Sequence, residues 1–583
     1  MHFLSFFKKL DSWLVLGLGC VFVRGLFVDV MDVDASQYAS ISMEMWQGGS
    51  WLEVMHRHTD YLDKPPLLFW LSAASMGVFG FTNFAYKLPA LVAAVAGIWA
   101  TYRFAKIFYP EKTAQHAALV LASSLGLMLM TNDVRTDILL LGTTACAVWQ
   151  LAEYQQQTRW PNLLAAFFCI GLAMLAKGPI GLVVPAFAVG SHLLLRRDWR
   201  GIFRWQWLVG LLVVAVVLAP MCWGLWHQFD LHPEKPLRDR RTTSGLYFFF
   251  WEQSFGRVTG ENVWHDDSTP LYFVHTYLWA FAPWSLLFVG ALWARFRAIF
   301  GQKLCLPVAD EGYSIGAFVL TFAALSTSNY KLPHYIFVTL PWASVLLARW
   351  LGSDFWAVAS RRRNVWVWVQ AVVCLLVMLL AWAAPGYFFS ENSGWMLAGL
   401  AVVFGGTALL LAPLPTDESV GCESKILQIF CPQPTDSSVG RLVRPSVVVA
   451  IGFGFALNFW FYPHLLPYQS TSQVGRYLRE NDISAERVGF FKRHGHALDF
   501  YAGGITRELK TPAQIRETAA ELGGFWLYTT EAGREELAAA GVAFVVERAF
   551  PHFQAARLRG DFLNPATREK SLEPTYLLKI KPL

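Results

Sequence analysis

PNLLAAFFCIGLAMLAKGPIGLVVPAFAVGSHLLLRRDWR, residues 161–200, contains two apolar runs separated by a single lysine and ends in a basic cluster. The runs at 161–176 and 178–195 each approach the length that crosses a bilayer as a helix. The arginines that follow are typical of a short loop kept on the cytoplasmic side. The stretch therefore predicts a membrane hairpin with Lys177 at its outer turn.

The composition of the whole chain supports the same interpretation. Of 583 residues, 55% are hydrophobic and 15% are charged, and the mean hydropathy is +0.37. Soluble proteins carry roughly 25% charged residues. The 15% of aromatic residues fits rings placed at both membrane surfaces. The net charge of +6 follows from basic cytoplasmic loops and gives no reason to expect a nucleic-acid partner.

Apolar runs and basic clusters together predict a topology. Lys8 and Lys9 precede the first run, Trp13 to Val28, and no small-residue cleavage site follows, so we expect an uncleaved first span with a cytoplasmic N-terminus. Placing the basic clusters inside predicts thirteen spans in all. The other twelve lie near 88–105, 115–131, 136–153, 161–176, 178–195, 206–224, 270–291, 313–328, 333–350, 365–384, 394–412 and 446–463.

Two segments are predicted not to cross. The run at 67–81 is short and follows Pro65 and Pro66, which favours a helix lying at the periplasmic interface. Charges become dense after the last span, where a strand-like VGFF precedes a helical PAQIRETAAELG. We therefore predict an all-α polytopic membrane domain over residues 1–465 and a periplasmic soluble α/β domain over residues 466–583.

Charged residues gather at the predicted outer edge of the membrane. Ionisable groups at such depth are costly and are usually kept for a pathway or a site. Snorkelling to the interface explains a single lysine but not a whole group. The group comprises Asp34, Asp63, Lys64, Asp137, Lys177, Arg257, His265 and Lys331.

Two of the contexts are distinctive: DVDASQYASISMEMWQGGSW at 32–51 and YLDKPPLLFW at 61–70. They resemble the opening of the bacterial GT-C glycosyltransferases of the aminoarabinose transferase and protein O-mannosyltransferase kind. That signature is an acid, a tyrosine a few positions later and a subsequent K-P-P. Asp34, Tyr38 and the Lys64-Pro65-Pro66 run match it, but Ala35 stands where the family usually has a second acid. Asp34 is therefore expected to act alone.

Four later segments extend the resemblance to about residue 341. They are VRTDILLL with Asp137, LAKGPIGLVVP with Lys177, WHDDSTPLYFVHTYLWAFAPWS with His265, and SNYKLPHYIFVTLP with Lys331 and Tyr335. The resemblance implies transfer of a sugar from undecaprenyl phosphate on the periplasmic face of the inner membrane. It points to 4-amino-4-deoxy-L-arabinose as the sugar and to lipid A or another envelope glycolipid as the acceptor.

Two alternatives remain open. The donor class fits protein hydroxyls as acceptors, as in O-mannosylation. A transporter or lipid flippase would also have many spans and intramembrane charges. The chain shows no internal repeat of several helices, however, and its charges cluster at one membrane face, which favours an interfacial active site.

The resemblance and the chemistry together assign roles. Asp34 would take the proton from the acceptor hydroxyl in an inverting attack, although it could also cap the helix that follows it. Lys64 and Lys331 would bind the donor phosphate, with Tyr335 donating a hydrogen bond and Arg257 as a further cation.

Tyr38, Asp137 and Lys177 are expected to have supporting roles. Tyr38 belongs to the same signature. Asp137 would position the donor sugar or brace the Asp34 loop, and Lys177 would bind phosphate or snorkel.

A divalent cation such as zinc, magnesium or manganese is a further possibility, with Asp63 and His265 as its ligands. No spacing of paired ligands supports it. The other histidines of these loops, His56 and His58, and those of the C-terminal segment, His494 and His496, are expected to be solvated surface residues.

Overall fold

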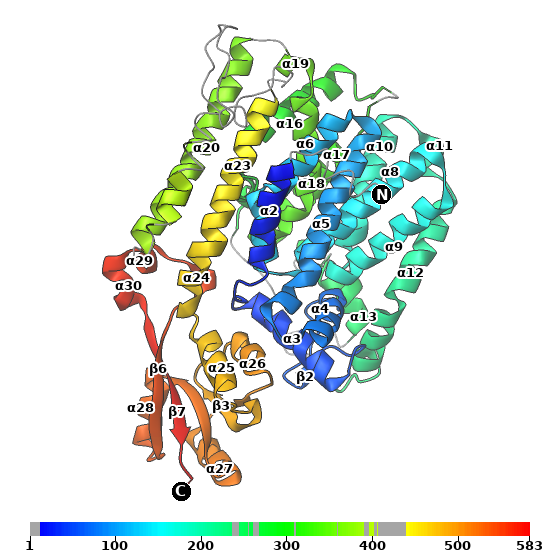
Figure 1. Ribbon diagram of the computed structural model, residues 1–583. Helices are drawn as coiled ribbons and strands as arrows, with labels where there is room; N and C mark the ends of the chain where they lie inside the picture. Colours follow the sequence, from blue (N-terminus) through cyan, green and yellow to red (C-terminus); the bar gives the residue numbers. More distant parts are fainter. Residues whose placement is uncertain are drawn as a thin grey trace.

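The computed structural model describes residues 12–235, 244–254, 256–259, 268–307, 310–357, 360–389, 394, 396–401, 405 and 439–582. The side chains of residues 257 and 258 are outside this description. Helices form most of the molecule, and a small sheet lies at one end of them (Figure 1). The short α3 and α4 helices and the β1–β2 hairpin lie at the same end as the sheet (Figure 1).

The first half of the chain is helical apart from one short hairpin. Its elements are α2 (Ser12–Gly25), α3 (Asp34–Gly48), β1 (Met55–His56), β2 (Thr59–Asp60), α4 (Leu67–Phe79), α5 (Asn83–Phe108), α6 (Glu111–Ala122), α7 (Leu125–Asn132), α8 (Thr136–Gln157), α9 (Trp160–Lys177), α10 (Ile180–Leu195), α11 (Trp199–Ile202), α12 (Gln206–Leu225) and the π-helix η1 (Trp226–Asp230).

The middle of the chain continues the helical bundle. Its elements are α13 (Gly245–Tyr247), the π-helix η2 (Phe248–Glu252), α14 (Gly256–Thr259), α15 (Tyr272–Ala280), α16 (Ser285–Gly301), α17 (Tyr313–Ser326), the 3-10 helix η3 (Pro333–Thr339), α18 (Leu340–Leu351), α19 (Asp354–Ala357), α20 (Arg361–Phe388), α23 (Gly440–Ala456), the π-helix η4 (Leu457–Phe461), α24 (Tyr462–Leu465) and the 3-10 helix η5 (Leu466–Tyr468).

Several helices are suited to a bilayer. Among the described residues, five helical stretches are long and apolar enough to cross a membrane, and the number rises to seven if each of two bent helix pairs is one span. The five are Asn83–Phe108, Trp160–Lys177, Trp199–Asp230, Arg361–Phe388 and Gly440–Tyr468. Large apolar side chains on α12 and α20 are exposed, as expected for helices that face lipid. The chain is thus a multi-pass membrane protein.

The predicted number of thirteen spans is not confirmed. The expected span at 115–131 is the pair α6–α7, bent by 50°, and the one at 270–291 falls on the pair α15–α16, bent by 118°. At the first bend the Ser124 hydroxyl donates to the Leu121 carbonyl, and at the second Pro283 interrupts the helix. Of the predicted span at 394–412, only residues 394, 396–401 and 405 are described.

Helix α8 shows why hydropathy alone misjudges some spans. It has 22 residues and is long enough to cross, but it is not among the stretches apolar enough to qualify. Most of its residues are buried between α5 and α9. A helix at the centre of a bundle meets other helices instead of lipid, so it can carry polar residues such as Asp137 and Thr144.

The C-terminal region is an α/β unit. Its helices are α25 (Ser470–Glu480), α26 (His496–Ala502), α27 (Pro512–Leu522), α28 (Glu531–Ala539), α29 (Gly560–Leu563) and α30 (Pro565–Ser571), with the 3-10 turns η6 (Ala485–Arg487) and η7 (Ala555–Arg557). Its strands are β3 (Val488–Phe491), β4 (Arg507–Glu508), β5 (Phe525–Thr530), β6 (Phe544–His552) and β7 (Glu573–Ile580).

The sheet has the order β4-β3-β5-β7-β6, in which β3 runs parallel to β4 and β5, and β7 runs antiparallel to β5 and β6. Alternate residues of β5 face opposite sides, because Leu527 packs with α27 and α28 while Tyr528 packs with α25 and α26. Helices α25 and α26 lie on the side that faces the bundle (Figure 1).

Candidate active site

Asp34 is the first residue of α3, and its carboxylate forms an ion pair with Arg135. Arg135 Nη2 also lies 3.0 Å from Asp133 Oδ2. The N-cap residue of α3 is Val33, and no side chain caps the helix, so the alternative of Asp34 as a cap does not hold. The carboxylate of Asp34 is 37% exposed and can meet a ligand from outside.

Arg135 is the site residue that sequence reasoning missed. It lies within the VRTDILLL segment, two positions before Asp137, and the segment drew attention only for its aspartate. A basic residue beside the predicted outer face was the available signal. Only the tertiary fold brings the turn before α8 against the start of α3.

Tyr38 lies one turn after Asp34 and is buried, with its ring edge-on to Phe69 at a centroid distance of 5.8 Å. Burial raises the pKa of the Tyr38 hydroxyl well above its usual value, and nearby Tyr61, Asp34 and Tyr335 add to the effect. Tyr38 is therefore a neutral hydroxyl, held within electrostatic range of both Asp34 and Tyr335.

A cavity of about 170 Å³ brings together three more of the predicted residues: Lys64, Lys177 and Tyr335. Lys64 enters it from the turn before α4, and Lys177 enters it from the last turn of α9. Gly178 follows with a φ of +79°, a conformation that favours glycine and lets the chain reverse into α10. The sequence prediction of Lys177 at a helical turn is thereby confirmed.

Asp137 holds Lys177 in place. The two side chains form an ion pair in which Asp137 is 3% exposed and Lys177 16% exposed. The Lys177 ammonium lies 3.9 Å from the centroid of the Tyr335 ring, and His334 Nε2 lies 3.7 Å from Asp137 Oδ2. Residues 135–137, at the start of α8, thus link the two halves of the site, because Arg135 contacts Asp34 and Asp137 contacts Lys177.

The other predicted residues lie beside this cavity or outside the described part of the chain. Lys331 is 6% exposed and does not line the cavity. Its ammonium donates hydrogen bonds to the Ser268 carbonyl at 3.1 Å and to the Ser268 hydroxyl at 3.3 Å. The Asp63 carbonyl accepts a hydrogen bond from Gln253, which itself lines the cavity. The Arg257 side chain and all of His265 lie outside the described residues.

The described residues contain no group of three or more His, Cys, Asp or Glu side chains placed to hold a metal ion. The proposed pairing of Asp63 with His265 lies beyond this observation, because His265 is not described.

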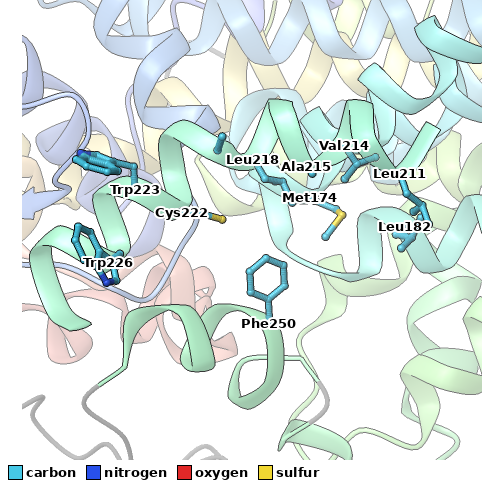
Figure 2. Close-up of a pocket in the computed structure, with 11 residues that line it drawn as sticks. Met174, Leu182, Leu211, Val214, Ala215, Leu218, Cys222, Trp223, Trp226 and Phe250 are labelled. Atoms are coloured by element: carbon cyan, nitrogen blue, oxygen red, sulfur yellow. The ribbon is translucent and has the colours of Figure 1, made fainter. Parts of the chain in front are cut away.

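An apolar groove of about 660 Å³ adjoins the cavity. Figure 2 shows side chains from α12 along it and the Phe250 ring pointing into it from η2. Its lining residues are Met174, Leu182, Leu211, Val214, Ala215, Leu218, Ala219, Cys222, Trp223, Trp226 and Phe250. Helices α9 and α10 and the segment at 250–254 contribute to both the groove and the cavity, so an apolar ligand in the groove could place a polar end in the cavity.

The expectation that His56 and His496 are solvated is wrong. Their rings lie 4.9 Å apart, between the β1–β2 hairpin and α26. Burial lowers the pKa of His56 to about 4 and that of His496 to about 2. Next to them, Arg57 forms an ion pair with the buried Asp499. The hairpin and α26 are more than 400 residues apart in the sequence, so local sequence patterns could not predict that they are in contact.

Several known proteins resemble this chain in sequence or in fold. The family model described as dolichyl-phosphate-mannose-protein mannosyltransferase matches residues 63–223. The undecaprenyl phosphate-alpha-4-amino-4-deoxy-L-arabinose arabinosyl transferase 2 of Proteus mirabilis is 26% identical over 64% of this chain and 66% of its own length. The corresponding transferase of Edwardsiella ictaluri is 25% identical over 69% of this chain and 72% of its own.

A solved structure shares nearly the whole fold. The crystal structure of ArnT from Cupriavidus metallidurans bound to undecaprenyl phosphate superposes with a TM-score of 0.70 at 18% identity. The superposition covers 97% of this chain and 98% of that one, so the likeness includes the C-terminal α/β region. In its motifs and its fold, the chain is thus similar to the GT-C glycosyltransferases that use lipid-linked sugars, a group that includes the aminoarabinose transferases and the protein O-mannosyltransferases.

Proposed function

We propose that the protein transfers 4-amino-4-deoxy-L-arabinose from undecaprenyl phosphate to lipid A or a related envelope glycolipid, with inversion at the sugar carbon. The observation that carries the proposal is the apolar groove beside a cavity lined by Lys64, Lys177 and Tyr335. A polyprenyl phosphate has this same division into a long apolar tail and a compact anion. The names of the Proteus and Edwardsiella relatives supply the sugar.

The donor would bind across the two parts of the site. Its tail would lie in the groove along α12, where burial of methylenes contributes affinity without specificity. Its phosphate would enter the cavity, where the Lys64 ammonium and the Tyr335 hydroxyl can donate to its oxygens. Lys331 and Arg257 are further candidate cations for the phosphate.

Stabilisation of the leaving phosphate would be the main electrostatic task of the protein. Negative charge grows on the phosphate as the bond to the sugar breaks, and fixed cations lower the energy of that state. Lys177 is oriented by Asp137 and by the Tyr335 ring before any ligand arrives. Such preorganisation avoids rearrangement during the transfer itself.

Asp34 would be the catalytic carboxylate. It would accept the proton of an acceptor hydroxyl while the acceptor oxygen attacks the anomeric carbon opposite the phosphate, which gives inversion. Its ion pair with Arg135 holds the carboxylate at the start of α3. If the acceptor group is a phosphate that is already ionised, Asp34 would orient it or contact the amine of the sugar.

The membrane orientation is part of the proposal. We place the N-terminus in the cytoplasm and the site and residues 466–583 in the periplasm of the inner membrane, with 466–583 forming a separate soluble domain. Support comes from the basic clusters, such as the arginines at 196, 197 and 200 that follow α10. Cysteine labelling at introduced loop positions would test each assignment.

The function is tested by transfer in detergent from purified undecaprenyl phosphate aminoarabinose to Kdo-lipid A. Release of undecaprenyl phosphate with a matching gain of mass on lipid A is expected. A serine- and threonine-rich peptide with a polyprenyl-phosphate mannose donor tests the protein-acceptor alternative, which is relevant because the matching family model is named for it. Transfer to the peptide alone would overturn the proposed acceptor, and no transfer from any polyprenyl-phosphate sugar would overturn the donor class.

A further inference from the structure

The segment that leads into Asp34 is held from the far end of the chain. Residues 26–33 connect α2 to α3, and the side chains that bind them come largely from α25, α26 and the residue before α25. The contacts join residues more than 400 positions apart. The C-terminal region therefore contacts the backbone immediately before the proposed catalytic carboxylate.

Gln469 makes the most regular of these contacts. Its side-chain amide accepts a hydrogen bond from the Asp32 backbone N–H at 2.7 Å and donates one to the Val30 carbonyl at 3.0 Å. The pair imitates the way a neighbouring β-strand would bind residues 30 and 32. Gln469 is 1% exposed, so loss of its amide would leave two backbone groups without these partners.

The Asp32 carboxylate is the second point of attachment. It accepts hydrogen bonds from the Thr471 hydroxyl at 2.7 Å, from the Ala497 backbone N–H at 3.1 Å and from the hydroxyl of Ser36 in α3. One carboxylate therefore joins α25, α26 and the first turn of α3. Asp34 lies in that same first turn.

Two further contacts fix the beginning of the segment. The Val30 N–H donates to the Tyr501 hydroxyl at 2.9 Å, and Tyr501 donates in turn to Asn83 Oδ1 at 2.7 Å. Arg476 forms an ion pair with Asp29. Four side chains of the C-terminal region, Gln469, Thr471, Arg476 and Tyr501, thus act on residues 29–32.

We infer that the C-terminal α/β region acts as a clamp that sets the position of Asp34, with Gln469 and Thr471 as positioning residues. The inference rests on the proposed function in taking Asp34 as the catalytic group. Displacement of a catalytic group by about 1 Å can cost on the order of a hundredfold in rate. The fixed loop would thus give the domain a part in catalysis through the position of Asp34.

Thr471→Val tests the clamp, because valine matches threonine in shape but cannot donate to Asp32. Ser470→Ala is the matched control: Ser470 is the adjacent buried residue of α25, but its hydroxyl bonds to His552 and Tyr528 within the C-terminal region. We expect Thr471→Val to lower kcat by about tenfold with little change in donor KM, and Thr471→Ser to restore it. Ser470→Ala should retain wild-type kcat in its folded fraction.

Hydrogen exchange of the full-length protein in detergent separates this inference from the proposed function. Peptides covering residues 28–40 should exchange faster in Thr471→Val and Gln469→Leu than in wild type or in Ser470→Ala, whatever the substrate is. If these two variants exchange faster but the wild type turns over no donor, the clamp is supported and the proposed function is overturned. Equal exchange in all four proteins, or equal kcat loss in Thr471→Val and Ser470→Ala, would overturn the clamp.

Discussion

The starts of α3 and α8 each place an aspartate in a first helical turn and pair it with a cation, but they bury it differently. Asp34, paired with Arg135, has a side chain that is 37% exposed, whereas Asp137, paired with Lys177, is 3% exposed. An accessible carboxylate can exchange a proton with an acceptor, and a sealed one can only orient its partner. Similar ion pairs therefore suit a reacting group in one place and a positioning group in the other.

The largest expected effect is on turnover in Asp34→Asn. The amide keeps the shape of the carboxylate but cannot take a proton, so kcat should fall by about a hundredfold to ten-thousandfold. Folding should be little changed, because the side chain is partly exposed. Donor-lipid release measures the first quantity and thermal unfolding in detergent the second. Turnover within tenfold of wild type would mean that Asp34 is not the base.

Asp137→Asn, in contrast to Asp34→Asn, should cause a large loss of folding stability. The change leaves the Lys177 ammonium in a mostly buried place without its carboxylate, a situation that costs about 3–5 kcal/mol in comparable pairs. Denaturant unfolding in detergent measures the loss.

The matched control for that prediction is the double variant Asp137→Asn/Lys177→Met. It removes the unpaired charge and should recover much of the stability without recovering transfer. If the double variant is no more stable than Asp137→Asn, the pair does not explain the burial of Asp137.

Lys64→Ala should act mainly on donor affinity. A charge-assisted contact to the phosphate contributes about 1.5–3 kcal/mol, so donor KM should rise by about tenfold to a hundredfold. Steady-state kinetics over a range of donor concentrations measures the change. Lys235→Ala removes a lysine that does not line the cavity and pairs with Asp60 at 3.1 Å, so it should leave KM unchanged. An equal effect of both variants would remove Lys64 from the phosphate site.

The smallest expected effect is in the groove. Ala215→Trp would occupy part of it and displace roughly one methylene of the donor tail, worth about 0.8 kcal/mol, so KM should rise about fourfold for the full-length donor. A donor with a short prenyl chain should be unaffected. Val216→Trp, at the next residue of α12 and outside the groove lining, is the control. Equal responses of the long and short donors would place the tail elsewhere.

The apolar pattern predicted the membrane class and many helices correctly, because burial in lipid leaves a strong mark on composition. It could not predict the bends at α6–α7 and α15–α16, since a bend does not change mean hydropathy. It also treated α8 as an ordinary span, although that helix is surrounded by protein. Counting apolar runs measures contact with a nonpolar medium and does not distinguish lipid from other helices.

Short motifs determined by themselves which residue types would gather at one end of the molecule: Asp34, Lys64, Lys177 and Tyr335 were all found in the sequence. Only the tertiary structure decided their partners. Arg135 meets Asp34, and Gln469 and Thr471 hold the loop before it, across separations of 101 residues and of 437 and 439 residues. The physical reason is that a motif records the chemistry a residue can perform, whereas its position and burial depend on contacts between distant segments.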